Sequence, residues 1–244
     1  QHLGHFIEMS SGVCHLGNAC IPLSLIRERA ASRFAQILSD IDGPKALVLG
    51  PGLSGSLGFV IEVSMLKNHG VHAMYELSPA SLPCSNNQVV YIVRAGDIAA
   101  LRVLAEQFHS HSQERHHHIC FMPRCTLLAE ATLVQLKVYG NMTRIELGVE
   151  LFPYDEDVIT MCLDGCLKEL LVDNDPSVLY YAASAIRTFE DMFGGIPKIS
   201  GKGDWASRVV QILNKLGHER PVAKDAPICG PVDELILIDR RVDM

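Results

Sequence analysis

The amino-acid sequence predicts an α/β protein: a parallel-sheet first domain with flanking helices, followed by an incomplete, helix-rich α/β second domain. From residue 45 onward, short apolar runs alternate with segments of helical apolar spacing, which is the pattern of βαβ units. The chain has 244 residues, 48% of them hydrophobic, so it can bury a core without disulfides or metals. The alternation breaks at residues 151–157, LFPYDED, and helical patterns prevail after it.

The predicted elements of the first domain follow in chain order. An amphipathic helix begins near Leu25 and ends near Asp40, because its apolar residues recur at helical spacing. Five strands of one parallel sheet then alternate with three helices, and Asp97 is expected to cap the second of these helices. The predicted strands are 46–49, 72–77, 88–93, 117–122 and 143–147, and the predicted helices are 57–68, 97–108 and 126–139.

Two helices and one strand are predicted after the break. Asp175 as N-cap, Pro176 at the first helical position and Gly194 just past the end frame the first helix. A second helix is expected over residues 203–217, and residues 235–238, LILI, predict a strand that is buried on both faces. Because such a strand needs covering elements, we expect the sequence to stop inside its second domain.

Composition and charge exclude several classes of function. The chain carries 21 Lys and Arg against 28 Asp and Glu, a formal charge of −7, which argues against binding along a nucleic-acid backbone. It contains no apolar run that could span a bilayer, and residues 1–10 lack the parts of a secretory signal. Its eight Cys form no CxxC pair, so free thiols are expected. Residues 1–22 are irregular, and the ordinary start at Met9 leads us to interpret residues 1–8 as read-through or a tag.

A glycine motif follows the first predicted strand. Gly50, Gly52 and Gly55 form a literal GxGxxG before a helix, which is the context of a dinucleotide fingerprint. Glu76, at the end of the second strand, stands where a ribose-binding carboxylate could be. Against this, Pro51 removes a backbone donor, and a tight turn with positive φ would require the same glycines. An NAD-dependent oxidoreductase is therefore the alternative, while the preferred interpretation has no catalytic residue and no cofactor.

A cluster of His and Cys raises the question of a metal site. Consecutive residues of a strand point to opposite faces, so His116, His117 and His118 cannot all converge on one ion. The cluster also lacks a pair with the spacing of a zinc site. We therefore predict no metal site from these residues. Its members are His109, His111, His116, His117, His118, Cys120 and Cys125.

The end of the chain carries the most specific pattern. The segment Leu237-Ile238-Asp239-Arg240-Arg241-Val242-Asp243 resembles the LLDRxxD signature of the Sec-one/Munc-eighteen (SM) family, whose members bind SNAREs in vesicle fusion. Its acids and arginines are expected to pair locally, so the signature is interpreted as structural. Further segments are similar to the lysosomal or vacuolar branch of that family, and more to its A form than to its B form. They are 63–71 (VSMLKNHGV), 121–124 (FMPR), 152–157 (FPYDED) and 196–203 (IPKISGKG).

The resemblance implies an organisation and a function. Residues 23–150 would form SM domain 1, and residues 151–244 the first part of SM domain 2, ending before domain 3. The protein would be a non-enzymatic subunit of the HOPS and CORVET tethering complexes that promotes SNARE assembly, with SNAREs and a Vps-sixteen-type subunit as partners. It would be cytoplasmic and peripheral on late endosome, lysosome or vacuole membranes through its partners only. The sequence does not single out partner-contact residues.

The chain departs from the family pattern in two places. Val93-Arg94-Ala95-Gly96 stands where the family has a VRPR-like stretch, so a proline and a basic group are missing. The glycines of the GxGxxG motif are not a family hallmark either, which weakens the dinucleotide interpretation and leaves the motif to be explained.

Overall fold

The structure is a computed structural model that describes residues 21–83, 87–110, 115–219 and 230–243. The chain forms two compact units, one of residues Pro22–Ala185 and one from Ile186 to the C-terminal end, and their boundary falls inside a helix. The expectations for residues 1–20 and for His111 lie outside the described residues. The assignment of residues 23–150 and 151–244 to two SM domains stays a prediction.

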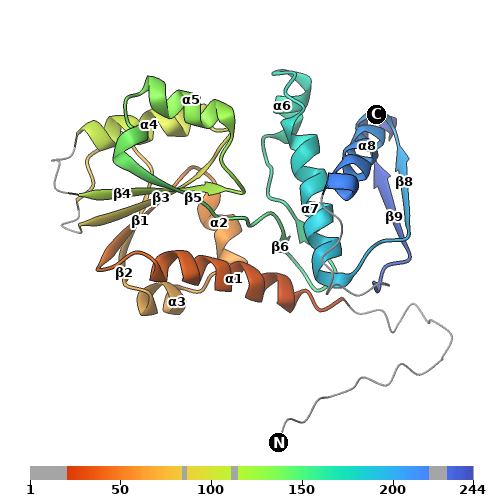
Figure 1. Cartoon of the computed structure of the whole chain (residues 1–244), viewed down its shortest axis with the longest axis horizontal. Coiled ribbons are helices and arrows are strands. Elements are labelled where there is room, and N and C mark those ends of the chain that lie inside the picture. Colours follow the sequence, from red (N-terminus) through yellow and green to blue (C-terminus); the bar gives the residue numbers. More distant parts are fainter. Residues whose placement is uncertain (1–20, 84–86, 111–114, 220–229, 244) are drawn as a thin grey trace, which may run out of the picture. The chain divides into compact units, whose positions relative to one another are not determined.

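The larger unit is built on a five-stranded sheet (Figure 1). Neighbouring strands run parallel throughout, and the strand order is β2-β1-β3-β4-β5. The predicted parallel sheet is therefore confirmed. The order reverses between β1 and β3, and in open α/β sheets that point marks a crevice at the carboxyl ends of the strands. The strands are β1 (Lys45–Leu49), β2 (Val71–Glu76), β3 (Gln88–Arg94), β4 (His116–Met122) and β5 (Met142–Glu146).

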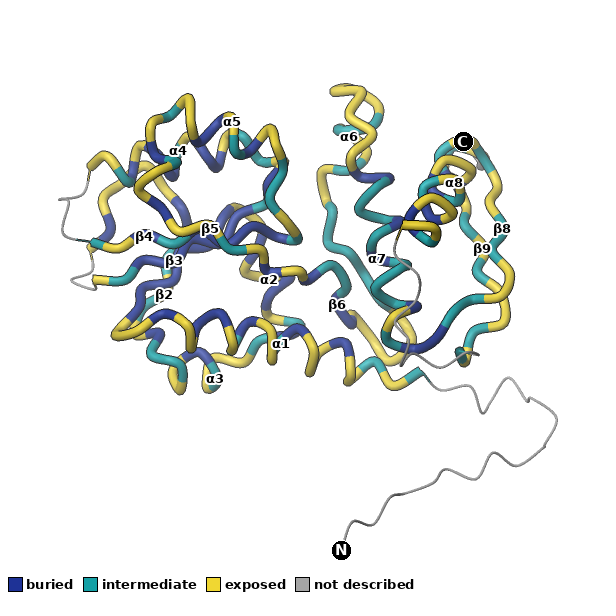
Figure 2. Tube along the Cα trace, viewed as in Figure 1, coloured by how far each residue is buried: buried dark blue, intermediate teal, exposed yellow. Residues whose placement is uncertain are grey.

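Helices cover both faces of this sheet (Figure 1). Alternate residues of a strand point to opposite faces, so Leu47 joins the core beneath α1, α2 and α3, whereas Val48 joins the core beneath α4 and α5. Figure 2 shows β1, β3 and β4 buried along most of their lengths. The apolar runs of these strands thus reflect burial on both faces. The helices are α1 (Ser24–Ser39), α2 (Leu53–Gly58), α3 (Val63–Asn68), α4 (Ile98–His109) and α5 (Leu127–Gln135).

Two of the predicted helices differ from the structure. The single helix expected over residues 57–68 is two short helices, α2 and α3, because Gly58 and the β-branched pair Val60-Ile61 are poor helix formers. The helix expected up to Tyr139 ends at Gln135, since Lys137 adopts a positive φ of 60°. A short 3-10 helix, η2 (Tyr139–Asn141), follows.

The segment after the sheet contains elements that the pattern did not predict. Strands β6 (Phe152–Pro153) and β7 (Ile159–Thr160) pair antiparallel at the break in the alternation, and α6 (Cys166–Leu171) follows them. Helix α7 (Ser177–Phe193) was predicted, and Asp175 caps it by accepting a hydrogen bond from the Ser177 amide at 2.9 Å.

The described part of the smaller unit contains the end of α7, a two-stranded parallel sheet and one further α-helix. Strand β8 (Lys198–Lys202) pairs with β9 (Glu234–Ile238), and α8 (Asp204–Glu219) and the 3-10 helix η3 (Arg240–Asp243) follow the two strands. Helix α8 continues two residues beyond Gly217, so the predicted stop was wrong. The described residues leave one face of β9 uncovered, since Ile236 and Ile238 are 63% and 66% exposed. None of the helices described is long and apolar enough to cross a membrane.

Candidate functional site

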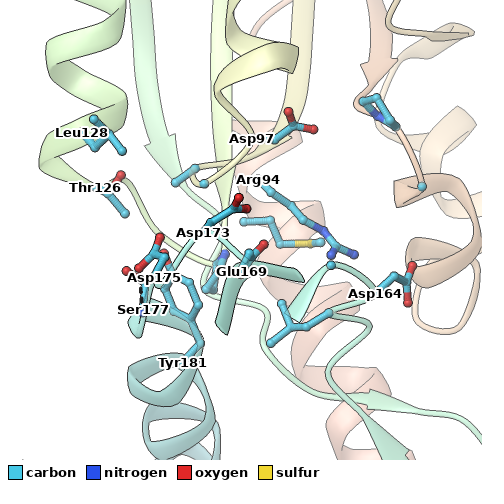
Figure 3. A pocket seen from close by; sticks show the side chains of 18 residues that line it. Arg94, Asp97, Thr126, Leu128, Asp164, Glu169, Asp173, Asp175, Ser177 and Tyr181 are labelled. Carbon is cyan, nitrogen blue, oxygen red and sulfur yellow. Dashed lines mark hydrogen bonds between the residues drawn. The ribbon is translucent and has the colours of Figure 1, made fainter. Parts of the chain in front are cut away.

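A pocket of about 390 Å³ opens at the carboxyl ends of β1, β3 and β4. The loops that follow these three strands supply one part of its lining, and the segment from Leu163 to Tyr181 supplies the other (Figure 3). Every lining residue belongs to the unit Pro22–Ala185. The pocket therefore lies at the switch point between β1 and β3, where open parallel sheets collect polar groups.

Acidic side chains outnumber basic ones in the lining of this pocket. Among the residues described there, Arg94 is the one basic side chain, and the acids are Asp97, Asp164, Glu169, Asp173 and Asp175 (Figure 3).

Three of the five carboxylates are held by the protein itself. Asp97 accepts a hydrogen bond from the Ala100 amide at 2.9 Å and so caps α4 as predicted. Asp175 caps α7, and Asp173 forms a 3.0 Å ion pair with Lys168. These three acids have structural roles. The side-chain carboxylates of Asp164 and Glu169 have no hydrogen bond or ion pair to any residue described.

Arg94 ends β3, in register with Met122 of β4. Its side chain is partly buried, and its Nε atom is buried without an acceptor among the residues described. No described carboxylate comes within ion-pair distance of its guanidinium group, although five carboxylates line the same pocket. In the sequence, Arg94 stands out only as part of a departure from the family pattern; its place at the end of a central strand is the signal for a site residue.

A second hollow of about 560 Å³ adjoins the pocket and shares Thr126, Leu128, Ser177 and Tyr181 with it. Arg124 lies over the ring of Tyr180, 4.4 Å from the ring centre, and donates a hydrogen bond of 3.2 Å to its hydroxyl. Sequence reasoning missed these residues, because Arg124 and Tyr180 belong to segments that only the tertiary fold brings together.

The thiol in this hollow is not activated for chemistry. Burial, followed by the charges of Glu130 and Glu146, raises the pKa of Cys125 to about 11. Burial raises the pKa of Cys120, in the core of the sheet, to about 12. A cysteine nucleophile requires a lowered pKa, so both thiols stay protonated at neutral pH. The four cysteines within the described ranges are free thiols.

The glycine motif after β1 forms a tight turn. The Gly50 amide donates to the Ile92 carbonyl at 2.8 Å, and a Cβ atom at Gly50 would lie 3.1 Å from that oxygen. Gly52 has a positive φ of 72°, which only glycine adopts readily, whereas Gly55 lies in open space. Of the four residues in the dinucleotide alternative, only Gly52 lines the pocket; Glu76 is exposed at the end of β2. Turn geometry thus explains the first two glycines, and the oxidoreductase alternative finds no support.

We predict different responses from two glycines of this motif. Gly52→Ala should lower the free energy of unfolding by about 1 kcal/mol, because alanine is strained at positive φ. Gly55→Ala should leave stability unchanged or raise it slightly, because that residue is helical and unobstructed. Urea unfolding followed by circular dichroism would measure both. Equal stability of the two variants would refute the turn explanation.

Calorimetric titration of NAD into the wild-type protein tests the dinucleotide alternative. We expect no heat of binding.

The histidine and cysteine cluster is divided among several environments. His117 is buried between the rings of Tyr91 and Phe108, with ring centres 5.9 and 4.7 Å away. His118 lies 3.0 Å from the side-chain oxygen of Gln88, and burial, followed by the charges of His116 and Lys45, lowers its pKa. Within the described ranges, no three His, Cys, Asp or Glu residues are placed to hold a metal ion.

The signature residue Asp239 organises the smaller unit. It is 5% exposed and directly follows β9. Its carboxylate accepts hydrogen bonds from the Trp205 amide at 3.1 Å, from the Arg241 amide at 3.0 Å and from the Arg241 guanidinium at 2.9 Å. These contacts, above all the one to the Arg241 side chain, lower its pKa to about 2. The Arg241 guanidinium also stacks 3.6 Å from the centre of the Trp205 ring.

The predicted local pairing of the signature is confirmed for Asp239, which pairs with Arg241, whereas Arg240 is exposed. The Trp205 amide at the start of α8 donates its hydrogen bond to Asp239 and not to the adjacent Asp204, whose side chain is 89% exposed. Of the other signature residues, Leu237 and Ile238 lie in β9, opposite Gly201 and Lys202 of β8. The side chain of Asp243 lies outside the described part.

Gly203 makes room for this arrangement. It has a positive φ of 100°, and a Cβ atom there would lie 2.4 Å from the Cβ atom of Asp239 and 2.9 Å from Val242. The signature therefore packs directly on the backbone between β8 and α8. It joins two segments that each resembled the SM family in sequence, 196–203 and 237–243.

Comparisons with known proteins agree with this assembly. The profile of the Sec1 family matches residues 45–244. The vacuolar protein-sorting-associated protein 33 homolog of Arabidopsis thaliana is 36% identical over 233 residues, covering 94% of this chain and 39% of the relative. Vacuolar protein sorting-associated protein 33A of Rattus norvegicus is 32% identical over 236 residues, with the same coverage. The 33B protein of Homo sapiens is 24% identical over 226 residues, covering 90% of this chain and 36% of the relative.

Solved structures show the same fold at low sequence identity. The SM protein Vps45 in complex with the Qa SNARE Tlg2 gives a TM-score of 0.64 at 14% identity, covering 88% of this chain and 39% of Vps45. The Unc18–syntaxin 1 complex from Monosiga brevicollis gives 0.64 at 14% identity, with coverages of 89% and 40%. The chain thus spans about two fifths of the length of these relatives. Because the family profile matches most of the sequence, the chain belongs to the Sec1 family of SM proteins and is Vps33-like in sequence.

Proposed function

We propose that the protein promotes SNARE assembly and vesicle docking in transport from endosome to lysosome or vacuole. The observation that carries the proposal is the Sec1-family match over residues 45–244, together with the signature residue Asp239 in a closed network with Trp205 and Arg241. The relatives at 31–36% identity are named for vacuolar protein sorting. The structures similar in fold include SM proteins in complexes with SNAREs.

We further propose that the protein acts by binding and not by catalysis. Its two most perturbed thiols have raised pKa values, which is the wrong direction for a nucleophile. Its glycine motif is accounted for by the turn at Gly50 and Gly52. In this proposal the protein is a subunit of the HOPS and CORVET tethering complexes, held on late endosome, lysosome or vacuole membranes through its partners.

Co-purification tests the proposal. The protein expressed from its complete reading frame should retain both a Vps-sixteen-type tether subunit and assembled endolysosomal SNAREs. A SNARE bundle from the plasma membrane serves as the control and should be retained less, because the proposed function is specific to transport from endosome to lysosome or vacuole. Failure to retain either the tether subunit or the endolysosomal SNAREs would contradict the proposal.

A further inference from the structure

We propose that the pocket at the carboxyl ends of β1, β3 and β4 binds a peptide segment of mixed charge, anchored by an acidic side chain on Arg94. This site goes beyond the proposed SNARE function, because it defines the chemistry of a ligand and not the protein that supplies it.

Within the described ranges, the Arg94 side chain lacks partners for its charge and for one buried hydrogen-bond donor. Its Nε–H group is buried without an acceptor among the described residues, and its guanidinium has no carboxylate at ion-pair distance. Leaving a buried donor unsatisfied is unfavourable, and guanidinium groups form strong, paired hydrogen bonds with carboxylates. A carboxylate that enters the pocket would satisfy this group. The five acids described in the pocket lining do not satisfy it: none pairs with Arg94, and Asp97 is held by the Ala100 amide.

The charge of the lining decides which anion fits. One cation stands against five carboxylates in the same pocket. A phosphate group carries up to two negative charges and would be repelled by these acids. A peptide carboxylate carries one charge and matches the planar guanidinium. The pocket therefore favours an acidic side chain over a phosphate.

The two acids whose side chains have no described partner, Asp164 and Glu169, indicate which side chains flank the acidic anchor of the ligand. The side-chain carboxylates of Asp164 and Glu169 line the pocket without an ion pair or hydrogen bond to a described residue, unlike those of the three acids that cap helices or pair with Lys168. Basic side chains that flank the acidic anchor would meet these two carboxylates. A volume of about 390 Å³ holds a few side chains. We therefore assign the ligand as a short segment with an acidic residue between basic ones.

Nuclear magnetic resonance of the complete chain, labelled with nitrogen-15 at its arginine Nε atoms, tests the site. The probes are the end-blocked tripeptide lysine-glutamate-lysine, its lysine-glutamine-lysine analogue and inorganic phosphate. The glutamate peptide should shift the Arg94 signal in a saturable way. The glutamine peptide should bind about tenfold more weakly, because it lacks the charged hydrogen bonds to Arg94. Phosphate should also bind more weakly than the glutamate peptide.

Two variants serve as matched partners in the same titration, monitored by the signals of the surrounding backbone amides. Arg94→Gln should weaken binding of the glutamate peptide about tenfold. Arg102→Gln removes the same charge at an exposed position of α4, outside the pocket lining, and should leave binding unchanged.

Several results would overturn the inference: equal binding of both peptides, tighter binding of phosphate, or equal losses in the two variants. The comparison of the probes uses the wild-type chain and does not depend on whether a variant folds. It also needs no SNARE, so its failure is distinguishable from failure of the proposed function.

Discussion

Asp239→Ala should lower the free energy of unfolding of the smaller unit by about 3 kcal/mol. The substitution leaves the Trp205 amide without its acceptor and the Arg241 guanidinium without its close partner. Removing one member of a buried, hydrogen-bonded charge pair typically costs this much. Urea unfolding followed by fluorescence measures it directly, because the single Trp of the chain is Trp205, at the centre of this network.

Asp204→Ala is the matched control. This acid lies 3.9 Å from the same guanidinium but is 89% exposed, so its loss should change stability by less than about 0.5 kcal/mol. Similar losses in the two variants would show that Asp239 does not organise the unit.

The same carboxylate makes stability depend on pH in a defined window. Its pKa is about 2 in the folded chain, lowered first by the hydrogen bond from Arg241, against about 3.9 in an unfolded chain. A group with a lowered pKa stabilises the fold above its unfolded value. This contribution should be complete above about pH 4 and should disappear as the pH falls toward 2. The Asp239→Ala variant has no carboxylate at this position and so lacks this pH-dependent contribution. The free energies of unfolding of the variant and the wild type should therefore converge as the pH falls.

Gly203→Ala should be at least as damaging, with a loss of about 3 kcal/mol or more. The new Cβ atom would stand 2.4 Å from the Cβ atom of Asp239, a buried atom that cannot swing away, and φ at this position is 100°. Steric overlap and backbone strain therefore add together. Trp205 fluorescence during urea unfolding again reports the loss, and reduced yield of folded protein would agree with it.

Gly217→Ala provides the opposite expectation in the neighbouring helix. No atom lies within 4 Å of a Cβ atom built at that position, and the residue is helical. Alanine should therefore stabilise α8 by up to about 1 kcal/mol.

A Gly203→Ala variant as stable as the wild type would mean that the signature does not pack on β8 as described.

Much of the fold could be predicted where local pattern and tertiary environment agree. The runs in β1 and β3 are apolar on both faces because both faces are buried, and the cap at Asp97 is encoded within one helical turn. The pattern failed where long-range contacts decide. Strand β8, with the sequence KISGK, is not apolar and becomes a strand through its parallel pairing with β9.

The candidate sites show the same division. The signature was recognised in sequence, but the hydrogen bond that the Trp205 amide donates to Asp239 joins residues 34 positions apart, which no local pattern encodes. The pocket around Arg94 is likewise assembled from loops that are distant in sequence. The literal GxGxxG pattern pointed to a dinucleotide site, but the pattern cannot distinguish such a site from a ligand-free turn. A tight strand-to-helix turn requires glycines whether or not a ligand binds.

Calorimetric titration of the protein from its complete reading frame with purified, assembled endolysosomal SNAREs tests the central claim most directly. The family membership and the proposed function predict saturable binding, with weaker or no binding of a plasma-membrane SNARE bundle under the same conditions. No binding to the endolysosomal bundle, or equal binding to both bundles, would contradict the account.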